Sequence, residues 1–253
     1  MHPTISRFAS ATFYGSRLLD GDEAVGRESD PAYAWRKDLP AFCPLAFLNL
    51  ATSAEVAGGA SRANREEADL AVNVASTFLA AHDRFNKKQE SPSVAIVAFY
   101  SAQIAEIKQA LKKNPRQQHR LLGSVEVNTV DAFQGREKDV VILSCVRASD
   151  DGVGFLRDAR RLNVAVTRAK HACILIGHDR TLRTDDRWRS LLDDTLHRGA
   201  FVDVPRASAD LCSLAARRPP SKGGSSFVDD IDSFAQETPQ NVRTSEQEDG
   251  ELR

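Results

Sequence analysis

Apolar residues along the chain follow two patterns that alternate with each other. Continuous apolar runs of strand length occupy residues 45–50, 94–99, 125–130, 140–146, 171–177 and 200–204, and such runs are typical of buried parallel strands. Between them, apolar residues recur at intervals of three and four over residues 62–79, 101–111, 156–169 and 188–196, which is the spacing of an amphipathic helix. Strands that alternate with helices predict an α/β domain with a mainly parallel sheet flanked by helices.

The two ends of the chain lack these patterns. Residues 1–44 are predicted to be an irregular segment, because Gly15, Gly21, Gly26 and Pro31 punctuate it. The predicted α/β domain covers residues 45–205. Residues 206–253 are predicted to be a mostly disordered tail. From residue 217 onward the chain is rich in Pro, Ser, Gly and acidic residues, and it cannot bury enough apolar surface to offset the entropy cost of ordering.

Composition narrows the class of protein without identifying it. Hydrophobic residues make up 42 % and charged residues 27 %, which are ordinary values for a globular protein with a sizeable core. The formal net charge is −1. From Arg217 onward five Lys/Arg face eight Asp/Glu, whereas the remainder carries 29 against 27. Because the excess of positive charge is so small, any nucleic-acid surface has to be local.

Cysteine usage and hydropathy point to an intracellular protein. The four cysteines lie far apart and form no C-x-x-C pair, so we expect neither a zinc site nor a disulfide framework: Cys43, Cys145, Cys173 and Cys212. Two of them, Cys145 and Cys173, lie inside apolar runs and are predicted to be buried. No apolar run approaches the length of a membrane span, and the first residues do not resemble a signal peptide. No membrane partner is therefore expected.

One stretch of the chain is locally basic. Residues 108–120 contain five Lys/Arg and one His. A solvated helix end followed by a loop explains this composition, and we favour that interpretation. The alternative is a patch that binds a nucleic-acid backbone.

The first segment with candidate chemistry is Val127–Arg147, VNTVDAFQGREKDVVILSCVR. An apolar run ends near Val130, a polar turn follows, and a long apolar run begins. Gly135 allows the backbone to turn or to approach a ligand closely. Ligands bind outside the carboxyl ends of the strands in open α/β sheets, so we expect this turn to lie there. A charged surface hairpin is the alternative interpretation.

The second segment is Gly154–Lys170, GFLRDARRLNVAVTRAK. Arg161 and Arg168 are seven residues apart, which places them on one face of a predicted helix. An apolar stripe backs this face. An arginine held on a rigid helix can stabilise the charge of phosphoryl transfer. Helix physics alone does not exclude an amphipathic helix with solvated arginines.

Together the two segments resemble motifs V and VI of superfamily 1B helicases of the senataxin and nonsense-mediated-decay type. Motif V of that family is similar to VDxFQGxEKD followed by LSCVR, and motif VI to GFLxDxRRxNVAxTRAK; both stand here nearly complete and correctly spaced. Residues 97–103 (VAFYSAQ) resemble the family's strand, aromatic and glutamine element. The family's S-x-x-N-x-x-E-A helix start is matched by Ser61, Asn64, Glu67 and Ala68. Residues 1–21 resemble the segment after motif III, so the resemblance covers about residues 1–205.

The resemblance implies a RecA-like fold and a role at one side of an ATP cleft. Arg168 would be the arginine finger on the γ-phosphate, and Glu137 would contact the ribose. Gly135 would let the backbone approach the nucleotide. Gln134 and Arg161 would couple the nucleotide cleft to the nucleic-acid path.

The resemblance also implies contacts with nucleic acid. Thr129, Tyr100 and Gln103 would touch the backbone of a single strand, which positions the strand without reading its sequence. Phe133 would pack inside the protein rather than stack on a base. The substrate class would be single-stranded RNA or DNA, including RNA/DNA hybrids. The senataxin-like detail at Gly177-His178 and residues 188–198 favours the nucleus over the cytoplasm.

Parts of the family's motor are missing from the sequence. The family motif before Met-His-Pro is Gln-Tyr-Arg-Met-His-Pro, and this chain begins at that Met. No G-x-x-x-x-G-K-[ST] P-loop occurs, and the family's Asp-Glu magnesium motif is absent. We therefore expect the distal half of an ATP-dependent helicase that uses ATP and Mg²⁺ only when a first RecA-like domain completes it.

A second hypothesis is a catalytically inactive fragment that binds nucleic acid or another protein. A coding sequence that continues upstream into Gln-Tyr-Arg would favour the first hypothesis, and a true start at Met1 would favour the second. A nuclease fused to such a motor is a third class, but no carboxylate cluster with metal-site spacing supports it.

Overall fold

A six-stranded parallel sheet forms the centre of the computed structural model, which describes residues 1–59, 61–86, 90–114 and 122–217. The strands are β1 (Leu45–Asn49), β4 (Val94–Ala98), β5 (Glu126–Thr129), β6 (Lys138–Ser144), β7 (Ala169–Gly177) and β8 (Phe201–Asp203). Their order is β5-β4-β6-β7-β1-β8, and all neighbours pair in parallel. Each predicted apolar run became a strand, and the predicted RecA-like α/β fold is confirmed.

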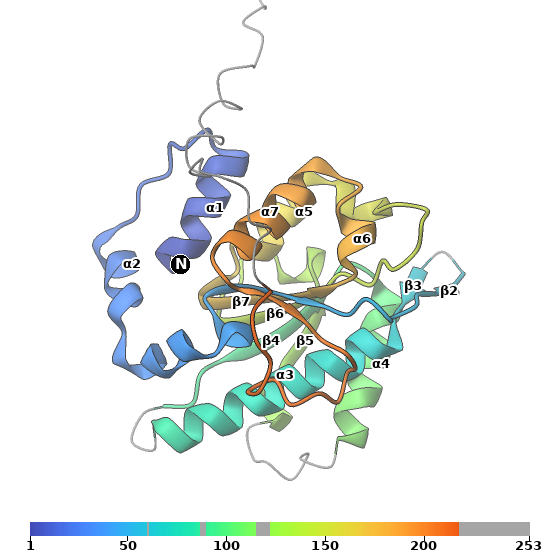
Figure 1. Cartoon of the computed structure of the whole chain (residues 1–253), viewed down its shortest axis with the longest axis horizontal. Coiled ribbons are helices and arrows are strands. Elements are labelled where there is room, and N and C mark those ends of the chain that lie inside the picture. Colours follow the sequence, from blue (N-terminus) through green and yellow to red (C-terminus); the bar gives the residue numbers. More distant parts are fainter. Residues whose placement is uncertain (60, 87–89, 115–121, 218–253) are drawn as a thin grey trace, which may run out of the picture. The chain divides into compact units, whose positions relative to one another are not determined.

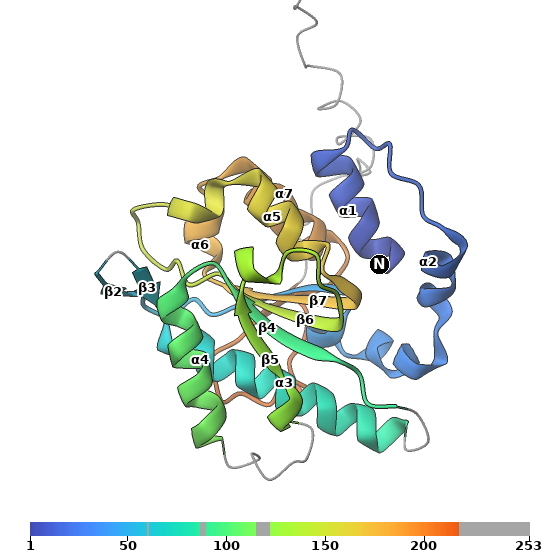
Figure 2. The same cartoon turned by 180° about the vertical axis from the view of Figure 1, so that it is seen from behind.

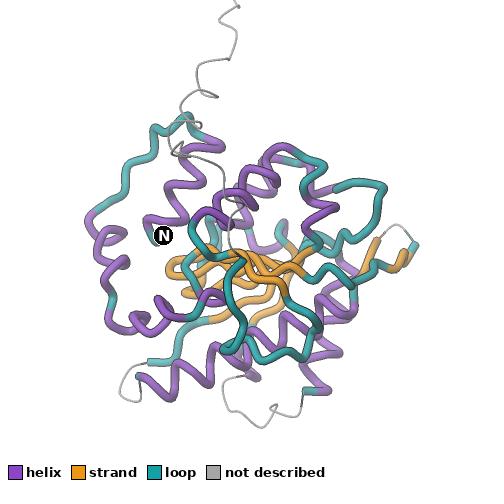
Figure 3. The backbone as a smooth tube through the Cα atoms, viewed as in Figure 1, coloured by secondary structure: helices purple, strands orange, loops and turns teal. Residues whose placement is uncertain are grey.

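Helices cover both faces of the sheet, as Figures 1, 2 and 3 show. One face packs against α3 (Arg65–Phe85) and α4 (Ser101–Lys113). The other packs against α1 (Pro3–Phe13), α5 (Ala159–Val166), α6 (Asp179–Leu182) and α7 (Asp186–His197). Side chains of a strand alternate between its faces, so Ile96 joins the first core and its neighbour Val97 joins the second. Burial on both faces explains why the strands are continuous apolar runs.

The register defines two edges of the sheet. Lys138 of β6 lies level with Ala169 of β7 at their amino-terminal ends. At the opposite ends, Ala98 of β4 lies level with both Thr129 and Ser144. We call these the amino edge and the carboxyl edge. A small antiparallel hairpin, β2 (Val56–Gly58) and β3 (Ser61–Ala63), follows β1 at the carboxyl edge.

The prediction of an irregular segment over residues 1–44 is wrong for its first third, where α1 forms. The His2 side chain accepts a hydrogen bond from the Thr4 amide at 3.1 Å and caps this helix, and Pro3 occupies its first position. The side chains of Ile5 and Phe8, on one face of this helix, are buried in the core. The rest of the segment consists of short turns: α2 (Asp22–Gly26) and 3₁₀ turns at Arg27–Ser29, Pro31–Asp38 and Pro40–Phe42. The glycines that suggested irregularity all follow α1 in the sequence.

The boundary proposed between domain and tail stays a prediction. Residues 206–217 are described and contain no helix or strand. Residues 218–253, which hold nearly all of the predicted disordered tail, lie outside the described residues, as does the 115–120 part of the basic stretch. Its first part is the exposed last turn of α4, which contains Lys112 and Lys113, as the helix-end interpretation predicts.

The remaining composition-based predictions concern cysteines and membranes. Cys145 and Cys173 are buried, as predicted. Burial raises the pKa of the Cys173 thiol to about 12, so this thiol is inert at neutral pH. Within the described ranges, no helix is both long and apolar enough to cross a membrane.

Candidate nucleotide and nucleic-acid site

The segment between β5 and β6 carries the first motif across one face of the sheet. It leaves the carboxyl edge at Thr129 and reaches the amino edge at Lys138. Midway, Phe133 is fully buried in the core, so the prediction that it packs inside the protein is confirmed. Gly135 has φ +78° and its Cβ position is in open space, so this glycine serves the turn that the sequence predicts. The charged residues beyond this turn therefore lie at the amino edge.

A backbone hydrogen bond joins the two motifs at the amino edge. The Lys138 amide donates to the Arg168 carbonyl oxygen at 3.1 Å. Glu137, whose side chain is exposed, is the residue before β6. Arg168 is the residue before β7 at the same edge of the sheet. The expectation that the polar turn lies at the carboxyl ends of the strands is therefore wrong for Glu137, which precedes β6 at the amino edge. The linking segment crosses the sheet before β6 begins, and spacing along the sequence does not reveal that crossing.

Arg168 lies just beyond the helix on which it was predicted. Helix α5 ends at Val166, and the Thr167 hydroxyl bonds back to the Asn163 carbonyl at 2.7 Å. Arg168 then belongs to the turn into β7, so it does not share a helix face with Arg161. Its Nε donates to the Val164 carbonyl oxygen at 3.0 Å and its Nη2 to the Thr167 hydroxyl at 3.0 Å. These bonds orient the guanidinium at a helix C-terminus, where a cation is stabilised.

Glu137, the predicted ribose contact, and Gln134, which is predicted to couple the nucleotide cleft to the nucleic-acid path, are both exposed. Glu137 lies close enough to the Met1 amino group to affect its pKa. Burial and the nearby Arg27 lower that pKa, and the charges of Glu137 and Asp20 oppose the change. Gln134 occupies the turn before Gly135.

Arg161 lies toward the carboxyl edge instead. Its Nε and Nη2 bind the two carboxylate oxygens of Asp131, each at 3.1 Å. Asp131 is the second residue after β5, so this two-pronged ion pair connects α5 to the loop at the carboxyl edge. The prediction that Arg161 couples two regions of the site stays a prediction, but the contact that would transmit such coupling is present.

The three predicted nucleic-acid residues differ in exposure. Thr129 is half-buried, and its hydroxyl accepts a hydrogen bond from the Ala132 amide at 3.3 Å. Tyr100 is buried except for a few per cent of its surface. Gln103 is fully buried, so this conformation does not place it on a surface that could touch nucleic acid. The reason is that the first turn of α4 packs against Asn64, the residue between β3 and α3.

Gln103 instead connects three elements. Its Oε1 accepts from the Asn64 amide at 2.7 Å, and its Nε2 donates to the Asn64 carbonyl at 2.9 Å and to the Ser144 hydroxyl at 3.0 Å. Every polar atom of the amide is used, which makes Gln103 a structural link between α4, α3 and β6. Helix α4 begins at Ser101, and the Ala102 amide in its first turn donates to the Ser61 hydroxyl of β3 at 3.0 Å.

A buried carboxyl group beside this link was not predicted as functional. Glu67 has no exposed surface, and its Oε2 accepts hydrogen bonds from the Ser144 hydroxyl at 2.7 Å and the Val146 amide at 2.8 Å. Asn64 caps α3 by accepting from the Glu67 amide at 3.1 Å, and its Nδ2 donates to the Val146 carbonyl at 3.3 Å. Burial raises the pKa of Glu67 to about 8, although the Ser144 and backbone hydrogen bonds oppose this change.

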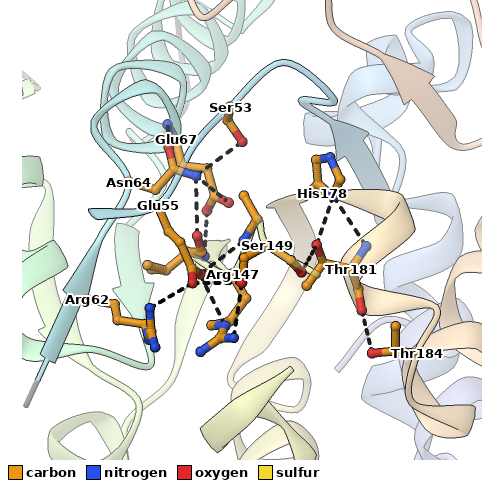
Figure 4. Close-up of polar contacts among 12 residues, drawn as sticks. Ser53, Glu55, Arg62, Asn64, Glu67, Arg147, Ser149, His178, Thr181 and Thr184 are labelled. Atoms are coloured by element: carbon orange, nitrogen blue, oxygen red, sulfur yellow. Dashed lines mark hydrogen bonds and ion pairs between the residues drawn. The ribbon is translucent and has the colours of Figure 1, made fainter. Parts of the chain in front are cut away.

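These contacts hold an unusual backbone conformation. Val146 has φ +72°, which is costly for a β-branched residue. Glu67 and Asn64 together bind its amide and its carbonyl. The strained residue turns the chain out of β6 so that Arg147 is directed toward Glu55, with Nε and Oε2 3.1 Å apart (Figure 4). The pair is an ion pair, because the Arg147 Nε–H is not aligned with the Glu55 carboxylate for a hydrogen bond.

The sequence of this chain is similar to the sequences of known proteins. Residues 1–180 match a family model described as an AAA domain. The chain is 37 % identical over 211 residues to Helicase sen1 of Schizosaccharomyces pombe, covering 83 % of this chain and 12 % of that protein. It is 38 % identical over 227 residues to the ATP-dependent helicase upf1 of the same organism, covering 88 % and 23 %. It is 33 % identical over 221 residues to Regulator of nonsense transcripts 1 of Dictyostelium discoideum, covering 87 % and 16 %.

The chain thus spans less than a quarter of the length of each of these three relatives. Among solved structures, it resembles the C-terminal domain of a possible DNA helicase from a Lactobacillus at 16 % identity. That match covers 70 % of this chain and 84 % of the other, and its TM-score of 0.39 is too low to carry an argument.

Proposed function

The chain belongs to the superfamily 1B helicases, in the group that contains Sen1 and Upf1, and from this premise we propose that it is the distal RecA-like domain of an ATP-dependent RNA or RNA/DNA helicase. In this proposal the amino edge faces the nucleotide and the carboxyl edge faces the single strand. A first RecA-like domain supplies the opposite side of the cleft.

The observation that carries the proposal is the hydrogen bond from the Lys138 amide to the Arg168 carbonyl. It places Glu137 and Arg168 beside each other although they are 31 residues apart in the sequence. The two residues that carry a carboxylate able to accept from ribose hydroxyls and a guanidinium able to bind phosphate thus lie on adjacent chain segments at one edge of the sheet. Within the described ranges, no acidic side chain pairs with Arg168, whereas Arg161, Arg183 and Arg198 all have carboxylate partners.

The residues of this chain fit half of an ATP site. Arg168 would bind the γ-phosphate and Glu137 the ribose, while the open turn at Gly135 would let the backbone approach the nucleotide. Mg²⁺ would have to come with the other half. The part of the chain that the structure describes contains no group of three His, Cys, Asp or Glu residues that could hold a metal. The one Asp-Glu dipeptide, Asp22-Glu23, begins the short helix α2 instead of ending an apolar strand.

Two segments of the chain connect the amino edge of the sheet with its carboxyl edge. Helix α5 and the turn that follows it lead from the Arg161–Asp131 pair, near the carboxyl edge, to Arg168 at the amino edge. The β5–β6 segment makes the same crossing beside it. Nucleotide contacts at one end of these two segments can therefore change the position of nucleic-acid contacts at the other end.

We predict that the 253-residue chain alone hydrolyses no ATP. Phosphoryl transfer needs phosphate, metal and attacking water to be positioned together, and the sequence has no P-loop to hold the phosphates. Phosphate release should therefore stay at the buffer level with and without single-stranded RNA. Release that RNA stimulates and that Arg168→Ala abolishes would show that the chain is a complete motor and would overturn the proposal of a half-site.

A further inference from the structure

An exposed aromatic ring lies at the carboxyl edge on a firmly anchored turn. Phe155 belongs to the 3₁₀ turn Gly154–Arg157, and 57 % of its surface is exposed. On either side of it, Val153 and Leu156 are buried in the core. The Leu156 carbonyl also accepts a hydrogen bond from the indole nitrogen of the fully buried Trp188 at 2.8 Å. The turn is therefore fixed by packing, and the exposure of Phe155 is not a consequence of a loose loop.

Two residues of the candidate site, Tyr100 and Arg161, also lie against the ring of Phe155. Its centroid lies 5.7 Å from that of Tyr100 at an interplanar angle of 44°, and the Arg161 guanidinium lies over it at 5.7 Å. Arg161 is itself fixed by its ion pair with Asp131. Gly154 has φ +55°, and a Cβ there would lie 3.1 Å from both the Tyr100 hydroxyl and the Arg147 guanidinium. A side chain at residue 154 would thus disturb the support of the ring.

We propose that Phe155 is a stacking platform for one base of the single strand, and this proposal rests on the proposed function. Its exposed neighbours in sequence are charged, namely Arg157, Asp158 and Arg160, so the ring does not lie in an extended apolar stretch of chain such as a protein interface core requires. An isolated, rigid aromatic ring beside an arginine is the arrangement by which proteins bind single strands without sequence preference. Tyr100, a residue of the predicted nucleic-acid path, lies directly against the ring.

The test compares a normal single strand with an abasic strand of equal length. The full chain should bind the normal strand more tightly, because only that strand can stack. Phe155→Ala should weaken binding of the normal strand about tenfold, within the range for one stacked base, and leave binding of the abasic strand unchanged. Phe155→Trp should retain the preference for bases, since an aromatic face is all that stacking requires.

Phe85→Ala is the matched control. Phe85 is also 57 % exposed, and the Arg84 guanidinium lies 5.7 Å from its ring. It ends α3, a helix about 30 Å long whose other end lies at the carboxyl edge, so binding should not change. Unaltered binding by Phe155→Ala would overturn the stacking proposal alone and would fit a protein contact instead. Equal weakening for both strands would also overturn it. Failure of the wild-type chain to bind either strand would overturn the proposed function as well.

Discussion

In a motor completed by a P-loop domain, Arg168→Ala is expected to lower steady-state ATP turnover about 10³-fold, at the lower end of the range for arginine fingers. Two hydrogen bonds to Val164 and Thr167 hold the guanidinium in place before any nucleotide arrives. A group fixed in this way acts mainly on the transition state, in which negative charge spreads over the phosphoryl oxygens. Apparent affinity for nucleic acid should change far less, because the proposed nucleic-acid surface is at the opposite edge of the sheet.

Two variants make this prediction specific. Arg168→Lys should not restore turnover, because a lysine can neither keep both anchoring bonds nor present a planar fork to phosphate. Arg160→Ala is the control, since the Arg160 side chain is 95 % exposed on α5, the helix that precedes Arg168, and its removal should leave turnover unchanged. If the Arg168 variants and the wild type turn over ATP equally, Arg168 is a solvated surface residue and its assignment as the finger is wrong.

The second large effect concerns stability. Glu67→Ala is expected to lower the free energy of unfolding by about 3 kcal/mol, since it leaves the Ser144 hydroxyl and the Val146 amide without their acceptor and opens a cavity in a closed core. The strained Val146 then loses one of the two contacts that hold it. Glu67→Gln keeps an acceptor oxygen and should cost only about 1 kcal/mol.

Glu66→Ala serves as the control for chemical denaturation. Glu66 is exposed in the same first turn of α3, so its removal should change the free energy of unfolding by less than about 0.5 kcal/mol. Equal effects of the substitutions at residues 66 and 67 would mean that the buried carboxyl group contributes nothing to the fold.

The same carboxyl group predicts a pH dependence. Burial raises its pKa from 4.5 to about 8, so the folded protein holds this proton more tightly than the unfolded chain does. The stabilisation is fully present below pH 4.5 and is lost as pH rises through about 8. Glu67→Gln cannot titrate, so the stability of the wild type relative to this variant should fall between pH 5 and pH 8. Urea unfolding of the wild type and of Glu67→Gln at pH 5 and at pH 8 measures this change. If the difference in the free energy of unfolding between the two proteins is the same at both pH values, the raised pKa of Glu67 is contradicted.

Much of the fold was predictable because the sheet is covered on both faces. Full burial makes strands such as β4 and β7 continuous apolar runs, and runs of that kind are visible without any structure. Gly135 was predictable for a similar reason, since a turn with positive φ selects glycine directly. The identity of the candidate residues came from motif resemblance, which spacing alone does not supply.

Other features depend on contacts that spacing does not encode. The periodicity over residues 156–169 predicts one helix, but Ala169 is buried as the first residue of β7, and an apolar residue satisfies either pattern. Gln103 and Glu67 belong to polar residue types that are usually exposed. Their burial depends on partners such as Asn64 and Ser144 that lie on other elements. The separation of the site into two edges depends on where the β5–β6 segment crosses the sheet.

The central claim, that this chain is one half of an ATP cleft, is tested most directly by measuring phosphate release from three proteins in the presence of single-stranded RNA. These are the chain alone, a P-loop domain of a relative alone, and the two joined in one polypeptide. The account predicts RNA-stimulated release from the joined protein only. Release by the P-loop domain alone at the rate of the joined protein, or no release from a joined protein that is folded and binds ATP, would contradict it.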